Sequence, residues 1–319
     1  MEGLAAIATL GAGPVGFGDR VDFTNATLLN MTCRADGVLL QPSLPAVNVE
    51  AYFADRFPPQ GVSVGMARIT SAPTFVPFST SAAASSAPRP PAPPAYAYPL
   101  PAPHNARARM RAGVGADSAL FLSVFATFAA EPIAIAPIDL WPQLPMPNAT
   151  AGGDGGDGGG VGVGGGVGAP LGYYVQMLSR TALCVDGAPA VASGCASFSA
   201  SANASAPLLT VDTGPYDHEV YSVSPVLGPG WALLGELAKF ARVSASRVAG
   251  LDASSASCGA PEQTPLCASI VGAAAERVSL AFVDPHGLVR IAAATLDAGG
   301  AARVACTCDS AKGTCGCSV

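Results

Sequence analysis

The sequence predicts a mainly β protein whose residues 119–319 form an antiparallel, sandwich-like domain. Short runs of aromatic and β-branched residues alternate with turn residues, and the clearest central strand is Leu120–Phe128. Near the C-terminus, Arg277–Phe282 and Leu288–Ala294 flank the tetrapeptide Asp-Pro-His-Gly at 284–287, which predicts a β-hairpin. Stretches with helical periodicity are almost absent, and this favours a sandwich of short strands.

Further strands of this domain are short apolar segments bounded by turn residues. Trp231 is expected in the core because Leu233 and Leu234 follow it closely. The segments are Ile138–Leu144, Tyr173–Leu178, Thr181–Val185, Leu208–Val211, Glu219–Val226, Trp231–Leu237, Arg242–Leu251 and Ala302–Thr307.

The region before the β-domain divides into two parts by composition. Residues 1–58 have an ordinary composition, whereas 59–118 is predicted to be an extended Pro/Ala-rich linker or insertion. Within it, Val62–Ile69 is expected to form a short strand, and Thr74–Phe78 a short extended piece that Pro77 interrupts.

Two low-complexity tracts are predicted to be disordered. Ser79–Arg111 is rich in serine, alanine and proline, and the loop Asn148–Gly168 within the β-domain is almost pure glycine. Neither tract buries enough apolar surface to offset the entropy that ordering would cost, so both are expected to be mobile.

The composition argues against two classes of partner. The net charge is −6, and the one cluster of basic residues, Arg107, Arg109 and Arg111, lies in the Pro/Ala-rich part, so nucleic-acid binding is not expected. The longest apolar run, Leu120–Ile138, contains Glu131 and two prolines, so it is a poor membrane span. We therefore expect no membrane partner.

Cysteines and sequons favour the secretory pathway or the cell exterior. Of nine cysteines, Cys184 with Cys195 and Cys258 with Cys267 each enclose a short polar loop, as disulfides do in an oxidising compartment. Glu2 and nearby glycines do not fit a signal peptide, so the sequence is expected to start internally. Four asparagines are candidate glycosylation sites: Asn25, Asn30, Asn148 and Asn203.

The last cysteines allow two interpretations. Paired Cys-x-Cys units at 306–308 and 315–317 could hold a soft metal through thiolates. Zinc sites use Cys-x-x-Cys with histidine support more often, and the nearest histidine, His286, is distant in sequence. Disulfides or a frayed tail are the alternative, and we assign no metal ligand.

Gly11–Phe53 carries the most residue-specific pattern in the chain. An apolar run ends at Gly13-Pro14-Val15, Asp19 is the first carboxylate after it, and Asp22–Leu29 is predicted to start a capped helix. An Asp-Gly turn at 36–37 and Leu-Leu-x-Pro follow. This order resembles the stretch after the catalytic region in raffinose synthases and related α-galactosidase-like glycoside hydrolases. A second block, 218–226 with 230–237, is similar to strands of that family's C-terminal β-domain.

The resemblance implies that residues 1–58 are the last segment of a (β/α)8 barrel. It implies a full-length protein that hydrolyses α-galactosides or transfers galactose, without a cofactor, with carbohydrate as its partner. Asp19 would lie at the rim of the pocket and bind substrate, or else cap a turn. The catalytic carboxylate pair that such hydrolysis requires would lie before this chain, so this chain alone is expected to be inactive.

The competing hypothesis is a secreted or cell-wall β-sandwich that binds carbohydrate or a protein partner without chemistry. The three histidines, at 104, 218 and 286, are predicted to lie in a linker, at a strand start and in a turn, so they suggest no nucleophilic triad. Trp141 and Trp231 could stack on sugar rings, although a core position is favoured for Trp231.

Overall fold

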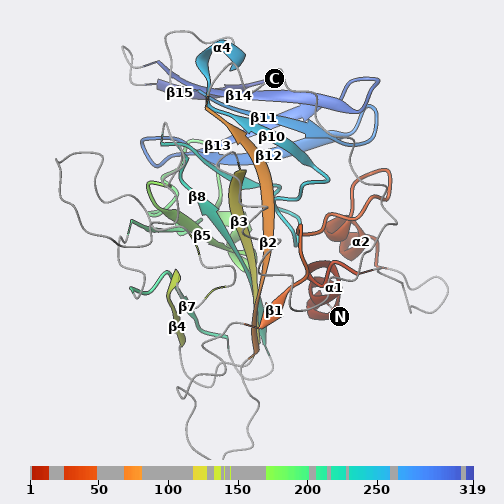
Figure 1. The fold of residues 1–319 in the computed structure, drawn as a ribbon, viewed down its shortest axis with the longest axis vertical. Helices are drawn as coiled ribbons and strands as arrows, with labels where there is room; N and C mark the ends of the chain where they lie inside the picture. Colours follow the sequence, from red (N-terminus) through yellow and green to blue (C-terminus); the bar gives the residue numbers. More distant parts are fainter. Residues whose placement is uncertain are drawn as a thin grey trace, which may run out of the picture.

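The structure, a computed structural model, describes residues 2–13, 25–48, 68–80, 118–127, 133–137, 140, 144, 170–200, 206–213, 217–227, 230–258, 265–309 and 314–319. Strands dominate these residues, so the prediction of a mainly β protein is confirmed. They form a ten-stranded sheet, a three-stranded sheet and a two-stranded ribbon (Figure 1). The predicted mobile tracts fall outside the described residues, apart from Ser79 and Thr80.

The main sheet has the order β15-β14-β11-β10-β2-β3-β8-β5-β6, with β1 beside β2. All its pairs are antiparallel except β2 with β10, which makes the sheet mixed where a purely antiparallel one was predicted. Its strands are β1 Val47–Asn48, β2 Arg68–Ser79, β3 Ser118–Thr127, β5 Tyr173–Met177, β6 Ser197–Ser199, β8 His218–Pro225, β10 Val248–Asp252, β11 Leu266–Val271, β14 Ala301–Asp309 and β15 Thr314–Ser318.

β2 lies in the middle of the main sheet and joins its two halves. It pairs with β3 along most of its length and with β10 at its last two residues. Phe75 donates its N–H to the Ser43 hydroxyl, away from β3. Pro73 and Pro77 lie two residues before and two residues after Phe75, so their backbone nitrogens also point away from β3. Proline has no N–H to donate, but at these positions no hydrogen bond between β2 and β3 is lost. This stretch, assigned from the sequence to short pieces within a linker, is therefore one twelve-residue strand.

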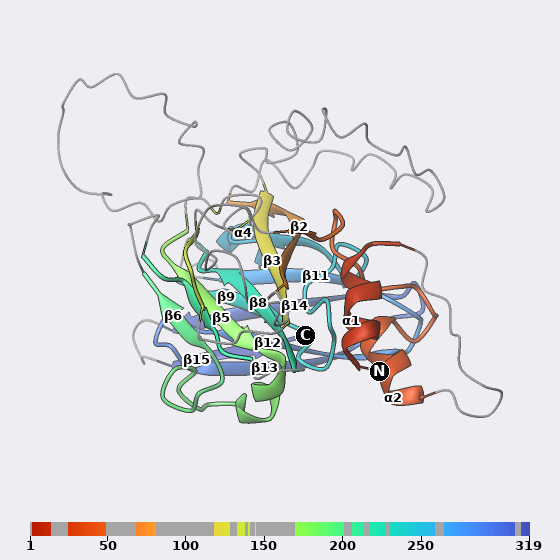
Figure 2. The same ribbon diagram turned by 90° about the horizontal axis from the view of Figure 1, so that it is seen from below.

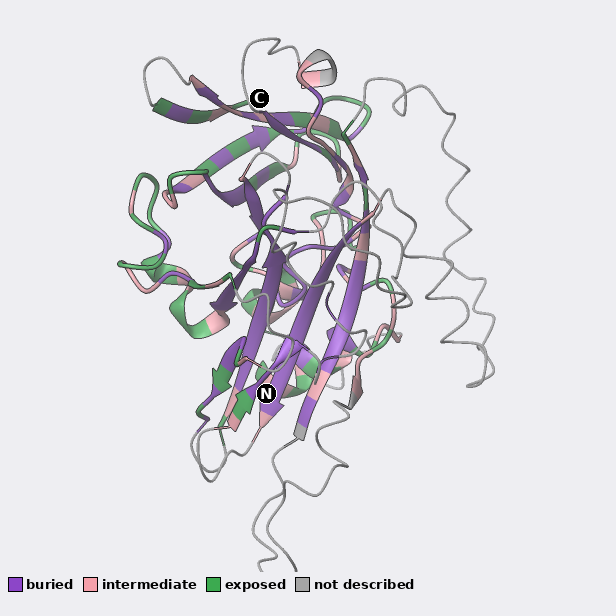
Figure 3. Ribbon diagram, turned by 60° about the vertical axis from the view of Figure 1, so that its left-hand side comes forward, coloured by how far each residue is buried: buried purple, intermediate pink, exposed green. Residues whose placement is uncertain are grey.

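β3 is buried on both faces, which explains its continuous apolar sequence (Figure 3). Leu122 and Val124 enter a cluster with the ribbon formed by β4 (Ile133–Ile135) and β7 (Leu209–Val211). Phe125 enters a second cluster and Phe121 a third. The predicted central strand is thus a meeting point of three hydrophobic clusters.

The three-stranded sheet packs against the C-terminal half of the main sheet. It consists of β9 (Ala232–Gly235), β12 (Arg277–Val283) and β13 (Val289–Thr295). Its apolar side chains meet those of β10, β11 and β14 in one cluster, where Trp231 is fully buried as expected. The predicted hairpin is present, and Asp284 in its turn accepts hydrogen bonds from the backbone N–H groups of His286 and Leu288.

The N-terminal residues form two short helices on one side of the main sheet (Figure 2). In α1 (Glu2–Leu10), Ala6 and Leu10 pack with Phe125 of β3 and Val220 of β8. The second helix, α2 (Ala26–Thr32), begins after Asn25, within the segment 22–29 where the sequence predicts a capped helix start. The side chain of Asn25 accepts two backbone N–H groups and so fixes the start. No helix of the described residues is long and apolar enough to cross a membrane.

Candidate functional site

The segment between β5 and β6 leaves the main sheet and closes on itself. A 3-10 helix, η4 (Leu178–Leu183), follows β5, and a disulfide joins Cys184 to Cys195 before β6 begins. This is one of the two cysteine pairs that the sequence predicts. The strand expected at Thr181–Val185 is absent, because the Thr181 hydroxyl donates to the Leu178 carbonyl within the turn. We call residues 178–195 the disulfide loop.

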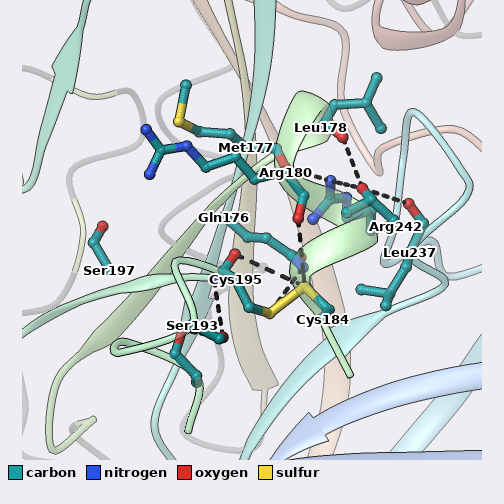
Figure 4. Close-up of a disulfide and its surroundings, with 12 residues drawn as sticks. Gln176, Met177, Leu178, Arg180, Cys184, Ser193, Cys195, Ser197, Leu237 and Arg242 are labelled. Atoms are coloured by element: carbon teal, nitrogen blue, oxygen red, sulfur yellow. Dashed lines mark hydrogen bonds between the residues drawn. A yellow bond between two sulfur atoms is a disulfide. The ribbon is translucent and has the colours of Figure 1, made fainter. Parts of the chain in front are cut away.

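A buried arginine supports the base of the disulfide loop (Figure 4). The Nη2 of Arg242 donates to the Met177 carbonyl and to the Thr181 hydroxyl, each at 3.0 Å. Thr181 also donates to the Leu237 carbonyl at 3.3 Å, and Gln176 donates to the Cys184 sulfur. Burial lowers the pKa of Arg242 to about 9, and the charge of Glu219 opposes part of this shift.

The far side of the disulfide loop is fastened to the β12–β13 hairpin. Backbone bonds of 2.8 Å run from Gly187 N–H to the Val289 carbonyl and from Val289 N–H to the Ala188 carbonyl. The Asp186 carboxylate accepts the N–H of Ile291, also at 2.8 Å. The loop is therefore held at its base, across its middle by the disulfide, and along the edge of β13.

This fastened loop exposes apolar side chains. Of the ten exposed large hydrophobic residues in the described part of the chain, three lie on it, Phe198 and Ile291 lie on β6 and β13 next to it, and Leu171 precedes β5. Val185 and Val191 are 57% and 54% exposed. We call the six residues the loop surface: Leu171, Leu183, Val185, Val191, Phe198 and Ile291. Exposed apolar residues that gather on one part of a folded protein are candidates for an interaction site.

Two contacts fix parts of this surface. The side chains of Arg180 and Leu183 both reach Gly194, at 3.9 and 3.5 Å from where a Cβ would stand. Phe198 packs its ring on Tyr174 with centroids 5.0 Å apart. Between 171 and 199 the sequence contains just two charged residues, the exposed Arg180 and Asp186. The candidate site is therefore apolar, rigid and locally neutral.

A buried ion cluster was missed by the sequence reasoning. Arg247 is fully buried, and its guanidinium donates to Glu236 at 2.8 Å and to Glu276 at 2.6 and 3.0 Å. In the sequence, Glu236 lies eleven residues before Arg247 and Glu276 lies twenty-nine residues after it, so no local motif reveals the cluster. The cluster lies in the fold's interior, where each charge has partners, so removing one partner would leave a buried charge uncompensated.

The residues proposed from the sequence as sites are scattered. Asn25 and Asn30 lie on the exposed side of α2, with Asn25 acting as its cap. Asp19, Asn148, Asn203 and Trp141 lie outside the described residues. His218 begins β8 and packs against Phe125, and its neighbour Glu219 accepts hydrogen bonds from Ser179 of the disulfide loop.

The remaining paired cysteines form disulfides. Cys258 of α4 (Ser255–Cys258) joins Cys267, the second pair predicted from the sequence. The two Cys-x-Cys units pair across the β14–β15 hairpin, as Cys306–Cys317 and Cys308–Cys315. A ring nitrogen of His286 lies within 4.8 Å of the sulfurs of Cys308 and Cys315, but sulfurs joined in a disulfide offer no thiolate to a metal. Four disulfides indicate an oxidising extracellular or secretory environment.

Comparison with known proteins gives no family. No model of a known protein family matches the chain, and no curated protein matches it either.

Proposed function

We propose that this chain is a non-catalytic module of the secretory pathway or cell exterior that binds a partner protein through the loop surface. The observation that carries the proposal is the exposure of three apolar side chains on the disulfide loop, Leu183, Val185 and Val191, with three more on the segments next to it. Exposing them to water costs free energy that burial against a partner recovers, at about 25 cal/mol per Å² of apolar area.

The chemistry of the loop surface favours a protein over a carbohydrate. Five of its six residues are aliphatic, and Phe198 is the one aromatic residue among them. Sugar rings are held by aromatic faces together with fixed polar groups, whereas aliphatic side chains pack against apolar protein surfaces.

The rigidity of the disulfide loop suits binding. A loop already fixed by the Cys184–Cys195 bridge and by bonds to β13 loses little conformational entropy when a partner docks. A mobile loop carrying the same side chains would bind more weakly. The fold also supports this role, since we interpret β9, β12 and β13 over β10, β11 and β14 as a sandwich-like support.

The α-galactoside hypothesis stays a prediction from two segments of sequence. Its substrate-binding candidate, Asp19, lies outside the described residues. The described part of residues 1–58 forms α1, α2 and β1, which pack on or pair with the main sheet. We therefore rank the binding module first and a terminal barrel segment second.

Site-specific photo-crosslinking in the cells that make the protein tests the proposal. A photoreactive phenylalanine analogue is placed at Val191, and in a matched control at Val38, which is 41% exposed and does not belong to the loop surface. We expect a discrete protein adduct from position 191 and none from position 38. Equal adduct yields at the two positions, or adducts to polysaccharide alone, would contradict a protein-binding surface.

A further inference from the structure

We propose that the partner of the loop surface is the same surface on a second copy of this chain, related by a twofold axis. The inference rests on the proposed function and specifies its partner. A twofold interface uses one patch twice, so the patch must be complementary to itself in shape and in charge.

The charges on the disulfide loop meet that requirement. Arg180 and Asp186 are both exposed, have opposite sign, and lie on either side of Leu183 and Val185 in the chain. We place the twofold axis between Arg180 and Asp186, so that Arg180 of each copy faces Asp186 of the other. Both ends of the interface then carry an attractive pair rather than a like-charge contact.

The neutrality of the loop also favours self-association. The whole chain carries a net charge of −6, which makes two copies repel over most of their surface. The segment 171–199 contributes one arginine and one aspartate, so it adds no net charge. This segment therefore adds no net repulsion when two copies meet at it.

The neighbouring edge of the main sheet is also open to a second copy. β6 (Ser197–Ser199) is the end strand and pairs with β5 alone among the described residues. It has no lysine, proline or acidic residue, the devices that keep sheet edges from pairing. The exposed ring of Phe198 lies on this strand, so the apolar surface continues to the sheet edge.

Charge exchange tests the twofold arrangement directly. The oxidised full chain is studied by sedimentation equilibrium, where a dimer has twice the 31.5 kDa mass of the chain. We expect Arg180→Asp and Asp186→Arg each to weaken dimerisation by roughly tenfold or more, because each creates two like-charge contacts. An equimolar mixture of the two variants should form heterodimers, since every contact is attractive again.

The mixture also controls for misfolding, because an unfolded variant cannot rescue its partner. Val191→Asp should give a monomer, whereas Val38→Asp, a change at a comparably exposed site, should dimerise as the unmodified chain does. A monomeric unmodified chain at roughly 100 μM, or a mixture no tighter than the single variants, would overturn the inference. A crosslink from position 191 to a different protein would also overturn it, while leaving the proposed function intact.

Discussion

Arg247 and Glu276 form a two-pronged ion pair, with Nη2 2.6 Å from Oε1 and Nη1 3.0 Å from Oε2. The backbone N–H of Ala35 donates to the same carboxylate at 3.1 Å. This one side chain therefore ties the segment after α2 to the turn before β12. Breaking the pair leaves the buried guanidinium with Glu236 as its one remaining carboxylate partner.

Glu276→Gln should lower the free energy of unfolding at neutral pH by about 3 kcal/mol, the cost of removing one partner of a buried ion pair. Urea denaturation measures the change. Glu2→Gln, at an exposed position in the first turn of α1, is the matched control and should change it by less than about 0.5 kcal/mol. Equal midpoints for the two variants would contradict the role assigned to the ion pair.

The Glu276 carboxylate determines part of the way the free energy of unfolding changes at acidic pH. Burial by itself raises the pKa of Glu276, but hydrogen bonds from Arg247, Ala273 and Ala35 outweigh it and lower the pKa from 4.5 to about 2. A group with a lowered pKa in the folded state stabilises the fold above its unfolded value, and this contribution is lost as the pH falls from 4.5 towards 2. The free energy of unfolding of the Glu276→Gln variant should not show this loss at acidic pH.

Gly235→Ala should destabilise the fold far more than Gly187→Ala. Both glycines have positive φ, +87° and +77°, but a Cβ on Gly235 would stand 2.2 Å from the Arg242 carbonyl oxygen. A Cβ on Gly187 meets nothing within 4 Å. We expect losses of more than about 3 kcal/mol and of about 1 kcal/mol, measured by thermal unfolding. Similar losses in the two variants would show that the backbone around Arg242 moves to make room for the new Cβ at position 235.

Opening the loop disulfide should loosen the disulfide loop. The double variant Cys184→Ala/Cys195→Ala should lose about 2–3 kcal/mol, as expected for an eleven-residue closure. Trypsin should cut after Arg180 faster than in the unmodified chain. Cys33→Ala, which removes the free cysteine, is the control and should leave the cleavage rate at Arg180 unchanged. Unchanged cleavage in the double variant would mean that the bonds to β13 alone hold the loop.

Asn25 should carry both a helix cap and a glycan. Its Oδ1 accepts the N–H groups of Thr27 and Leu28, which leaves the Nδ2 atom, where a glycan attaches, out of the cap. Asn25→Asp should lose the glycan and keep the cap, whereas Asn25→Ala should lose both and about 1 kcal/mol of stability. Mass spectrometry before and after enzymatic deglycosylation measures the first effect. An unmodified Asn25 in secreted protein would contradict the glycan assignment.

Local patterns predicted much of the β-domain. The run at 120–128, the hairpin turn at 284–287 and the burial of Trp231 follow from composition within a few residues, and all are present. The pairing of Cys184 with Cys195 follows from a short separation in the chain. Such features depend on neighbours in sequence, which a single sequence displays.

The features that the sequence did not predict depend on contacts between residues far apart in the chain. Pro77 predicted a short, interrupted extended piece, and its compatibility with a long strand depends on the side of β2 to which its nitrogen points. The loop surface is an apolar cluster that no motif marks, because apolar residues in sequence usually predict a core. Their exposure becomes visible once the disulfide loop is placed on the edge of β13.

Hydroxyl-radical footprinting of the protein in its natural surroundings tests the central claim most directly. Labelling of Leu183 and Val185 is compared between the natural assembly and the purified Val191→Asp chain, with Val38 as internal reference. The account predicts that Leu183 and Val185 are strongly protected in the natural assembly while Val38 is labelled equally in both. Equal labelling of Leu183 and Val185 in the two samples would contradict a partner-binding role for the loop surface.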